Sequence, residues 1–294
     1  MRSSPVLLLL PIVALASCGA PKGSNNPDAM SENAAAAGDH MAMGGQAMGK
    51  ERKGAPSMSL ALKPAGPFAV GRSQAVALML TDLATGKSMG PDDMAVAHTK
   101  KLHLLIIDGS LSDYQHIHPQ YDPSKPGTWR FDFAPRFGRT YKVWADVTRP
   151  NGGQEYVGTE MVAGDQPAPK PSSAVATKAA ADGLIFSLSF SGPLKVGQAA
   201  QGSIAIADGK TGQPFAGLQP IMGAFGHIVA FAGNWNSIEH VHPLGAEPTL
   251  ETERGGPVIR FHIEPEQAGT LKLFAQIRAN GRETIVPFTL TVQR

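Results

Sequence analysis

Residues 103–119 read HLLIIDGSLSDYQHIHP. An apolar run, a turn around Gly109 and a second run that ends in His-x-His-Pro are typical of a β-hairpin. The pattern returns in residues 227–243 as HIVAFAGNWNSIEHVHP, with Gly233 at the position of Gly109. In both copies the second histidine follows the first by 13 positions, and the third follows 2 positions later. The chain therefore carries the same histidine-bearing hairpin twice.

Similarity between the copies extends over most of the chain. Upstream of the hairpins, residues 66–71 (GPFAVG) match residues 192–197 (GPLKVG). Downstream, residues 140–145 (TYKVWA) match residues 270–275 (TLKLFA). The offset between the copies is 126 upstream, 124 in the hairpin and 130 downstream, so it changes only where turns can absorb insertions. This predicts two copies of one domain, each large enough for its own core.

Each copy has the pattern of an all-β domain. Short apolar runs alternate with turns rich in Gly, Pro, Asp and Ser, and we find no apolar stripe with the helical period. The expected boundaries of the two domains are 57–164 and 181–294, with a Pro/Ser/Ala linker at 165–180. We expect strands in the first copy at residues 59–62, 75–80, 102–107, 115–118, 129–133 and 141–147. The predicted fold is two tandem immunoglobulin-like antiparallel β-sandwiches.

The N-terminus has the features of a secretory signal. Arg2 precedes an apolar run at residues 6–15, which is too short for a permanent membrane helix. Residues 15–18 read LASC, which resembles the lipobox of bacterial lipoproteins. The resemblance implies that a signal peptide, residues 1–17, is removed and that Cys18 is acylated and anchors the chain. An ordinary cleaved signal with a chance cysteine is the alternative.

Two further expectations follow from the cysteine. Gly19 stands where aspartate is the usual inner-membrane retention signal, so the resemblance implies the periplasmic face of the outer membrane. Cys18 is the only cysteine, which excludes a disulfide within the chain and a cysteine-based metal or redox site.

Residues 18–56 are predicted to form a disordered tether, because they are rich in small and polar residues and have no strand or helix period. Potential soft ligands lie close together in it: His40, Met41, Met43 and Met48. Thioethers favour Cu(I), and imidazole accepts Cu(I) or Cu(II). We expect weaker copper ligands here; the alternative is low-complexity sequence without a ligand role.

The spacing of the hairpin histidines is suited to a metal site. Positions two apart in a strand share a face, so His116 and His118 project together. A turn centred near Gly109 sets His103 opposite His118, with the two side chains starting about 5 Å apart at Cβ. Imidazoles at that spacing can converge on one ion at about 2.0–2.1 Å from each nitrogen. A register slipped by one residue would send His103 to the opposite face.

The second hairpin is expected to place His227 opposite His242, with His240 beside them. Five positions upstream of the first histidine the copies differ, with His98 in one and Met222 in the other. The expected ligand sets are His98, His103, His116 and His118, and Met222, His227, His240 and His242. A mixture of imidazole and thioether favours copper, with zinc as the alternative. An exposed polar strand face would also explain one His-x-His pair, but the repeated spacing favours ligation.

The hairpin with one histidine followed by His-x-His-Pro resembles secreted bacterial domains found beside copper-handling genes, including the YtkA-like group of immunoglobulin-like domains. The resemblance covers most of residues 57–294 and is most specific in the hairpin. It implies a β-sandwich with a periplasmic or cell-surface role in metal handling. It carries over to His98, His103, His116 and His118 and to their counterparts in the second copy.

Composition and motifs narrow the function classes. The net charge of +2 gives no reason to expect nucleic acid as a partner. The sequence has no hydrolase nucleophile motif, phosphate loop or zinc-protease helix motif. Asp92, Asp93 and Asp113 fall in predicted turns and are expected to be solvated. No enzyme activity is therefore predicted.

The leading hypothesis is a lipid-anchored periplasmic protein that buffers or delivers copper. Its expected partners are the metal ion, the membrane through Cys18, and an envelope protein that accepts or exports the metal. The second hypothesis is an envelope protein-interaction module whose histidines bind no metal. The third is a redox enzyme with a histidine-bound metal.

Overall fold

The computed structural model of the chain describes residues 54–164, 166–239 and 241–294, and only the backbone of His242 and Pro243. The predicted residues that lie outside this description are Cys18, His40, Met41, Met43, Met48 and His240. The described residues all belong to one compact unit. Apart from a 3-10 turn, η1 (Pro91–Asp93), the elements described are β-strands, which confirms the all-β prediction.

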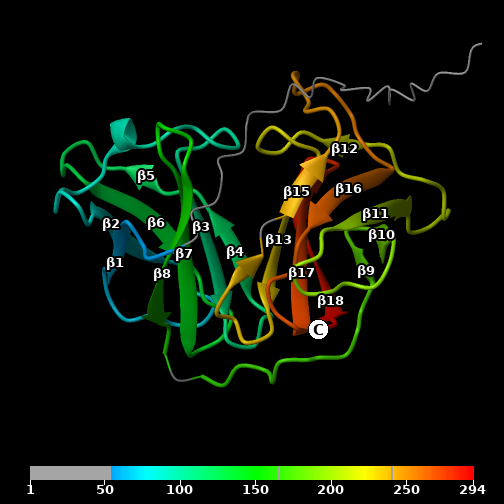
Figure 1. The fold of residues 1–294 in the computed structure, drawn as a ribbon, viewed down its shortest axis with the longest axis horizontal. Coiled ribbons are helices and arrows are strands. Elements are labelled where there is room, and N and C mark those ends of the chain that lie inside the picture. Colours follow the sequence, from blue (N-terminus) through cyan, green and yellow to red (C-terminus); the bar gives the residue numbers. More distant parts are fainter. Residues whose placement is uncertain (1–53, 165, 240) are drawn as a thin grey trace, which may run out of the picture. The chain divides into compact units, whose positions relative to one another are not determined.

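Repeat 1 is a sandwich of two antiparallel sheets. Its strands are β1 (Met58–Pro64), β2 (Gln74–Asp82), β3 (Leu102–Asp108), β4 (Tyr114–Ile117), β5 (Gln120–Tyr121), β6 (Thr128–Phe133), β7 (Thr140–Thr148) and β8 (Gln154–Val162). One sheet has the order β1-β2-β6-β5 and the other the order β4-β3-β7-β8. The hairpin strands β3 and β4 therefore lie at one side of the second sheet (Figure 1).

Repeat 2 has the same two-sheet plan with extra strands. Its strands are β9 (Lys178–Ala181), β10 (Leu184–Phe190), β11 (Ala200–Asp208), β12 (Leu218–Gln219), β13 (His227–Ala232), β14 (Ile238–Glu239), β15 (Val241–Leu244), β16 (Val258–Ile263), β17 (Gly269–Ala279) and β18 (Arg282–Val292). One sheet has the order β15-β16-β11-β10-β9. The other has the order β12-β17-β13-β14, and β18 also pairs with β17.

Two features of the strand order differ from the prediction. The linker is shorter than residues 165–180, because β9 begins at Lys178 and pairs with β10. Strand β8 was not predicted, because it opens with the polar pair Gln154 and Glu155. Both are buried, and the Glu155 carboxylate accepts hydrogen bonds from the backbone N–H and the hydroxyl of Ser57.

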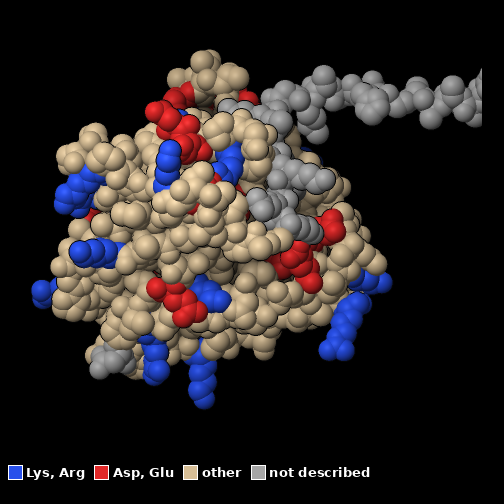
Figure 2. Space-filling model, turned by 60° about the vertical axis from the view of Figure 1, so that its left-hand side comes forward, with Lys and Arg blue, Asp and Glu red and all other residues tan. Residues whose placement is uncertain are grey.

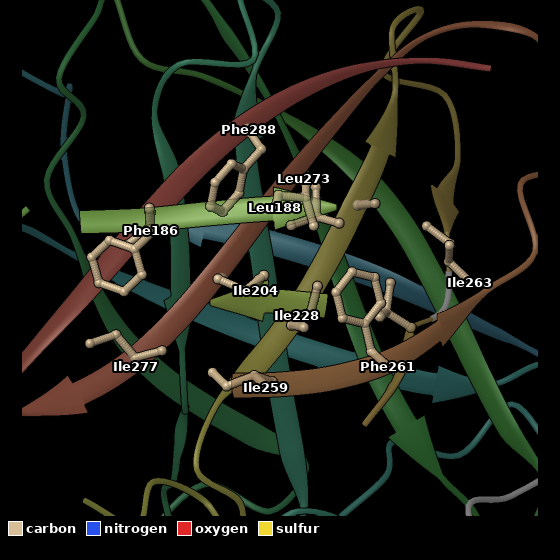
Figure 3. Close-up of a cluster of buried hydrophobic side chains, with 14 of the residues drawn as sticks. Phe186, Leu188, Ile204, Ile228, Ile259, Phe261, Ile263, Leu273, Ile277 and Phe288 are labelled. Atoms are coloured by element: carbon tan, nitrogen blue, oxygen red, sulfur yellow. The ribbon is translucent and has the colours of Figure 1, made fainter. Parts of the chain in front are cut away.

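The sheets of each repeat enclose an apolar core. In repeat 2, Phe186 and Ile204 from one sheet and Leu273 and Phe288 from the other are all 0% exposed. Figure 3 shows these side chains pointing into the same interior space. Alternation of buried and exposed residues along β10 and β11 accounts for this arrangement, since successive side chains of a strand face opposite sides.

Tyr141 anchors the corner that precedes β7 in repeat 1. Its hydroxyl accepts a hydrogen bond from the backbone N–H of Phe137 (3.1 Å) and donates one to the carboxylate of Asp113 (2.7 Å). Such a tyrosine near the start of a strand is a hallmark of immunoglobulin-like sandwiches. The expectation that Asp113 is solvated was wrong: it is 1% exposed, because its carboxylate also accepts the backbone N–H of Arg136.

The outer face of the β3 sheet is covered by repeat 2. Leu105 and Ile107 share a face with His103 and belong to an apolar cluster with Phe231 and Phe274 of repeat 2. All seven residues of β3 are buried as a result, since the other face of the strand lies in the core of repeat 1. The interface between the repeats therefore runs directly beside the hairpin histidines.

The surface shows no accumulation of one charge on the face seen in Figure 2, where Lys and Arg are interspersed with Asp and Glu. This agrees with the small net charge of +2. Within the part of the chain that the structure describes, no helix is long and apolar enough to cross a membrane.

Candidate metal centre

The first hairpin has the predicted register. Leu104 pairs with Ile117 and Leu105 pairs with His116 between β3 and β4. Continuing this ladder by one residue sets His103 opposite His118, and His116 is then diagonal to His103. All three imidazoles consequently lie on one face of the hairpin, as the two-residue period of a strand requires.

Three ring nitrogens converge at this face. Nδ1 of His103 lies 3.1 Å from Nε2 of His116 and 3.1 Å from Nε2 of His118. One ring nitrogen from each histidine lies within 4.8 Å of the other two. Nitrogens held at about 2.0–2.1 Å from a tetrahedral ion are about 3.3 Å apart, so the observed separations fit a single first-row ion.

Hydrogen bonds on the far side of two rings fix which nitrogen is free. Nε2–H of His103 donates to the carbonyl oxygen of Ala97 at 2.9 Å. Nδ1–H of His116 donates to Oε1 of Gln276, in repeat 2, at 2.9 Å. The amide of Gln276 is itself oriented, because its Nε2 donates to Glu283 at 3.4 Å. Each ring therefore carries its proton away from the convergence point.

This arrangement places two lone pairs against each other. Nδ1 of His103 and Nε2 of His116 are both unprotonated and 3.1 Å apart, so neither can donate to the other. A shared cation removes the repulsion between them. Orienting bonds from the second ring nitrogen to a carbonyl or amide oxygen are also usual for histidines that bind metals. The three residues thus fit the donor set of a metal site.

Burial keeps these imidazoles neutral. Desolvation lowers the pKa of His103 and lowers the pKa of His116 well below its ordinary value; in His116 the neighbouring histidines act in the same direction. The pKa of half-buried His118 is lowered to about 4, mainly by burial. Neutral imidazole is the form that ligates a metal, so these lowered pKa values favour the ligating form of the three side chains.

His98 does not join the converging nitrogens of the triad His103, His116 and His118. Its ring centroid is 6.0 Å from that of His103 but 4.9 Å from that of His227 in repeat 2. His227 in turn lies 6.3 Å from His116. The structure therefore brings histidines of both copies into one cluster, where the sequence predicted two separate sites.

The second hairpin departs from its predicted pairing. Strands β13 and β14 pair Ala230 with Glu239, in the register expected. The chain then crosses to the other sheet, where the backbone of His242 pairs with His262 of β16 instead of lying opposite His227. The crossing strand begins at Val241 in repeat 2 but only at Gln120 in repeat 1, so the second strand of the hairpin leaves its partner earlier in repeat 2. Met222 contributes its carbonyl oxygen, which accepts from Nε2 of His227 at 3.2 Å.

Sequence reasoning missed the residues around the ligands. Gln276 is opposite His227 in the β13–β17 pair, and Asp146 is opposite His103 in the β3–β7 pair. Asp146 is 8% exposed, and burial raises the pKa of its carboxyl to about 6. Asp146 in β7 and Gln276 in β17 occupy equivalent positions of the two repeats, among mostly apolar neighbours. This shared polar position was a signal that could have identified both residues.

Comparison with known proteins gives limited guidance. Residues 178–294, which form repeat 2, match a family described as a domain of unknown function, DUF8832. No curated protein matches the chain.

Several solved structures align with both repeats at low identity. A red sea bream transglutaminase aligns at 10% identity and a TM-score of 0.23, covering 82% of this chain and 32% of that one. Domains 4 and 5 of the S-layer protein SbsC align at 12% identity and a TM-score of 0.23, covering 81% of this chain and 100% of that one. The D00-D0 domain of intimin aligns at 10% identity and a TM-score of 0.22, covering 79% of this chain and 99% of that one. The chain thus spans about a third of the length of the transglutaminase. The assignment of immunoglobulin-like sandwiches is based on the sheet order and register of the present structure.

Proposed function

We propose that this protein binds a first-row transition-metal ion through His103, His116 and His118, and that the ion is copper. The convergence of three ring nitrogens, two of them forced to be unprotonated by hydrogen bonds to Ala97 and Gln276, carries the proposal. Three neutral nitrogens leave room for a further ligand or for the acceptor of the ion. This is the arrangement needed to hold a metal and release it again.

Copper is favoured over zinc by general coordination chemistry. Nitrogen donor sets bind Cu(II) more tightly than Zn(II), and imidazole also accepts Cu(I). The thioethers of Met41, Met43 and Met48 in the N-terminal segment would add soft ligands near the anchor. The resemblance of the hairpin to YtkA-like domains points in the same direction.

We further propose that the protein works in the cell envelope as a lipoprotein that buffers copper or passes it to an envelope protein. The support is the signal-like start, with Arg2, the apolar residues 6–15 and the LASC sequence ending at Cys18. Labelling cells with a radioactive fatty acid tests this part separately. The label should enter the wild-type protein and be absent from Cys18→Ser.

The metal proposal is tested by competitive titration of the full chain with Cu(I), Cu(II) and Zn(II) against chromophoric chelators. His116→Ala should lose the tightest equivalent, since it removes the nitrogen that Gln276 orients. His262→Ala is the matched control, because His262 is exposed on β16 and lies outside the triad. Equal affinity of the two variants would refute the triad, and tighter binding of zinc than copper at equal pH would refute the metal assignment.

A further inference from the structure

His98 lies in a tight turn that costs backbone energy. The turn is closed by two hydrogen bonds between Ala97 and Lys100, and its central residues His98 and Thr99 have φ of 46° and 68°. Positive φ at both centres defines a type I′ turn, which favours Asn and Gly. A histidine held there, with a ring that is mostly shielded from solvent, calls for a functional explanation.

The ring of His98 meets a ring from the other repeat. The centroids of His98 and His227 are 4.9 Å apart, with an angle of 87° between their planes. Within the triad, the pair His103–His118 has a centroid separation of 4.8 Å and an interplanar angle of 80°. The two pairs therefore have similar ring separations and interplanar angles, although one joins two strands of a hairpin and the other joins two repeats.

Both rings of this pair have a nitrogen to offer. Nε2–H of His227 donates to the carbonyl oxygens of Ile221 and Met222, each at 3.2 Å, which leaves Nδ1 unprotonated. It is the same nitrogen that His103, the counterpart of His227, directs into the triad. His98 makes no hydrogen bond with any residue that the structure describes, so its ring is free to turn a lone pair toward His227.

The pair lines a cavity that carboxylates also line. The cavity of about 50 Å³ is lined by His98, His227, Asp146 and Glu239, together with His103 and His116. This volume exceeds the roughly 10–15 Å³ that one water needs, so an ion fits. The carboxylate of Asp146, held by Nε2 of Gln154 at 2.9 Å, supplies negative charge next to it.

We infer that His98 and His227 form a second metal position, shared between the repeats, that takes a soft monovalent ion such as Cu(I). Two imidazole nitrogens satisfy Cu(I), which accepts two-coordinate binding, whereas zinc requires about four ligands. The position uses none of the three triad nitrogens. This second position therefore goes beyond the proposed function, and it can be tested separately from the triad.

The test uses the full chain and Ag(I), a redox-inert probe for Cu(I), with native mass spectrometry to count the bound ions. His227→Gln keeps a donor for the two carbonyl oxygens but removes the free Nδ1, and His98→Asn keeps a residue suited to the type I′ turn. Each should bind one Ag(I) fewer than wild type. His118→Gln should lose a different equivalent, so that His118→Gln with His227→Gln loses two, while His262→Gln loses none.

Histidine ¹⁵N NMR supplies a readout at the atom itself. Addition of Ag(I) to wild type should shift the Nδ1 resonance of His227, and should still do so in His118→Gln. Unchanged stoichiometry in both His227→Gln and His98→Asn, or an unmoved Nδ1 resonance, overturns the second position and leaves the triad standing. Loss of both ions in either single variant overturns it too, because the ions would then share one site. Loss confined to His227→Gln and His98→Asn would support it and refute the triad instead.

Discussion

The hairpins of the two repeats begin alike and end differently. In both, the first histidine donates from Nε2 to a carbonyl oxygen of the turn before its strand. In repeat 1 the second strand stays beside β3 as far as Ile117, and three rings converge. In repeat 2 the second strand leaves β13 after Glu239 and continues as β15 on the opposite sheet.

The difference teaches that the same His-x-His-Pro spacing can accompany two different strand pairings. The two repeats differ in which strand forms backbone hydrogen bonds with the segment that carries His-x-His-Pro. When β4 pairs with β3, His116 lies diagonal to His103; when β15 pairs with β16, the backbone of His242 lies opposite His262. Repeat 2 contributes to the histidine cluster in another way, through the contacts of Gln276 and His227 with His116.

The largest expected effect comes from comparing substitutions of histidines in the two hairpins. His116→Ala should weaken the tightest copper site by roughly 1,000-fold or more, about 4 kcal/mol, because it removes one of three converging nitrogens. His242→Ala should change that affinity by less than about threefold, since its backbone belongs to the other sheet. Chelator competition measures both. A loss in His242→Ala as large as that in His116→Ala would show that the hairpins are equivalent after all.

Acid should destabilise the metal-free protein through both hairpins. Burial lowers the pKa of His118 to about 4 and that of His227 to about 3. Below the ordinary value of about 6.5 the unfolded chain binds protons that the folded chain does not. The free energy of unfolding should therefore fall between pH 6.5 and 4, by at most about 1.4 kcal/mol per pH unit for each such histidine and less for half-buried His118.

Asp146 works in the opposite direction, because a pKa raised to about 6 means that acid favours its folded, protonated form. Urea unfolding of chelator-treated protein at several pH values measures the sum. His227→Gln should flatten the dependence, as should His118→Gln by a smaller amount. The same pH dependence of stability in wild type, His227→Gln and His118→Gln would contradict the desolvation of these histidines.

The contribution of repeat 2 to the triad can be separated from the ligands. Gln276→Leu should weaken copper binding about 10–100-fold, because Nδ1–H of His116 then loses its acceptor. Gln276→Glu keeps an acceptor oxygen and should stay close to wild type or bind more tightly. The same chelator competition applies, with thermal unfolding as a check on folding. If the Leu variant binds like the wild type, repeat 1 builds the site without help.

The smallest expected change in the free energy of unfolding concerns Tyr114, whose equivalent in repeat 2 is Ile238. Tyr114 and Ile238 open the second strands of the two hairpins and belong to the apolar cluster between the repeats. The hydroxyl of Tyr114 is buried with no hydrogen-bond partner among the described residues. Tyr114→Phe should raise the free energy of unfolding by up to about 1 kcal/mol. If urea unfolding shows instead that Tyr114→Phe lowers the free energy of unfolding by more than about 1 kcal/mol, the hydroxyl has a hydrogen-bond partner.

Local pattern was sufficient for much of repeat 1. Alternation and turn residues located β1, β2, β3, β4, β6 and β7. A turn near Gly109 was enough to set the register of His103 against His118, because a two-strand ladder propagates from its turn. The apolar side chains of Leu105 and Ile107 lie on the same face as His103, and residues of repeat 2 cover this face.

What the sequence did not reveal depends on contacts between distant segments. Gln276 reaches His116 across 160 positions, and no local pattern links them. Asp113 reads as an ordinary turn residue until Tyr141 and Arg136 are seen to bond to its carboxylate. The second hairpin crosses to the other sheet at Val241, which pairs with Ile263 of β16, and the spacing of the histidines cannot show this.

The doubly covered strand β3 has a consequence for how the protein is made. Its outer face is shielded by Phe231 and Phe274, which belong to repeat 2. At a synthesis rate of about 5–20 residues per second, the last strands of repeat 2 follow β3 after roughly 10–40 s. During that interval Leu105 and Ile107 lack the side chains that cover them in the folded protein.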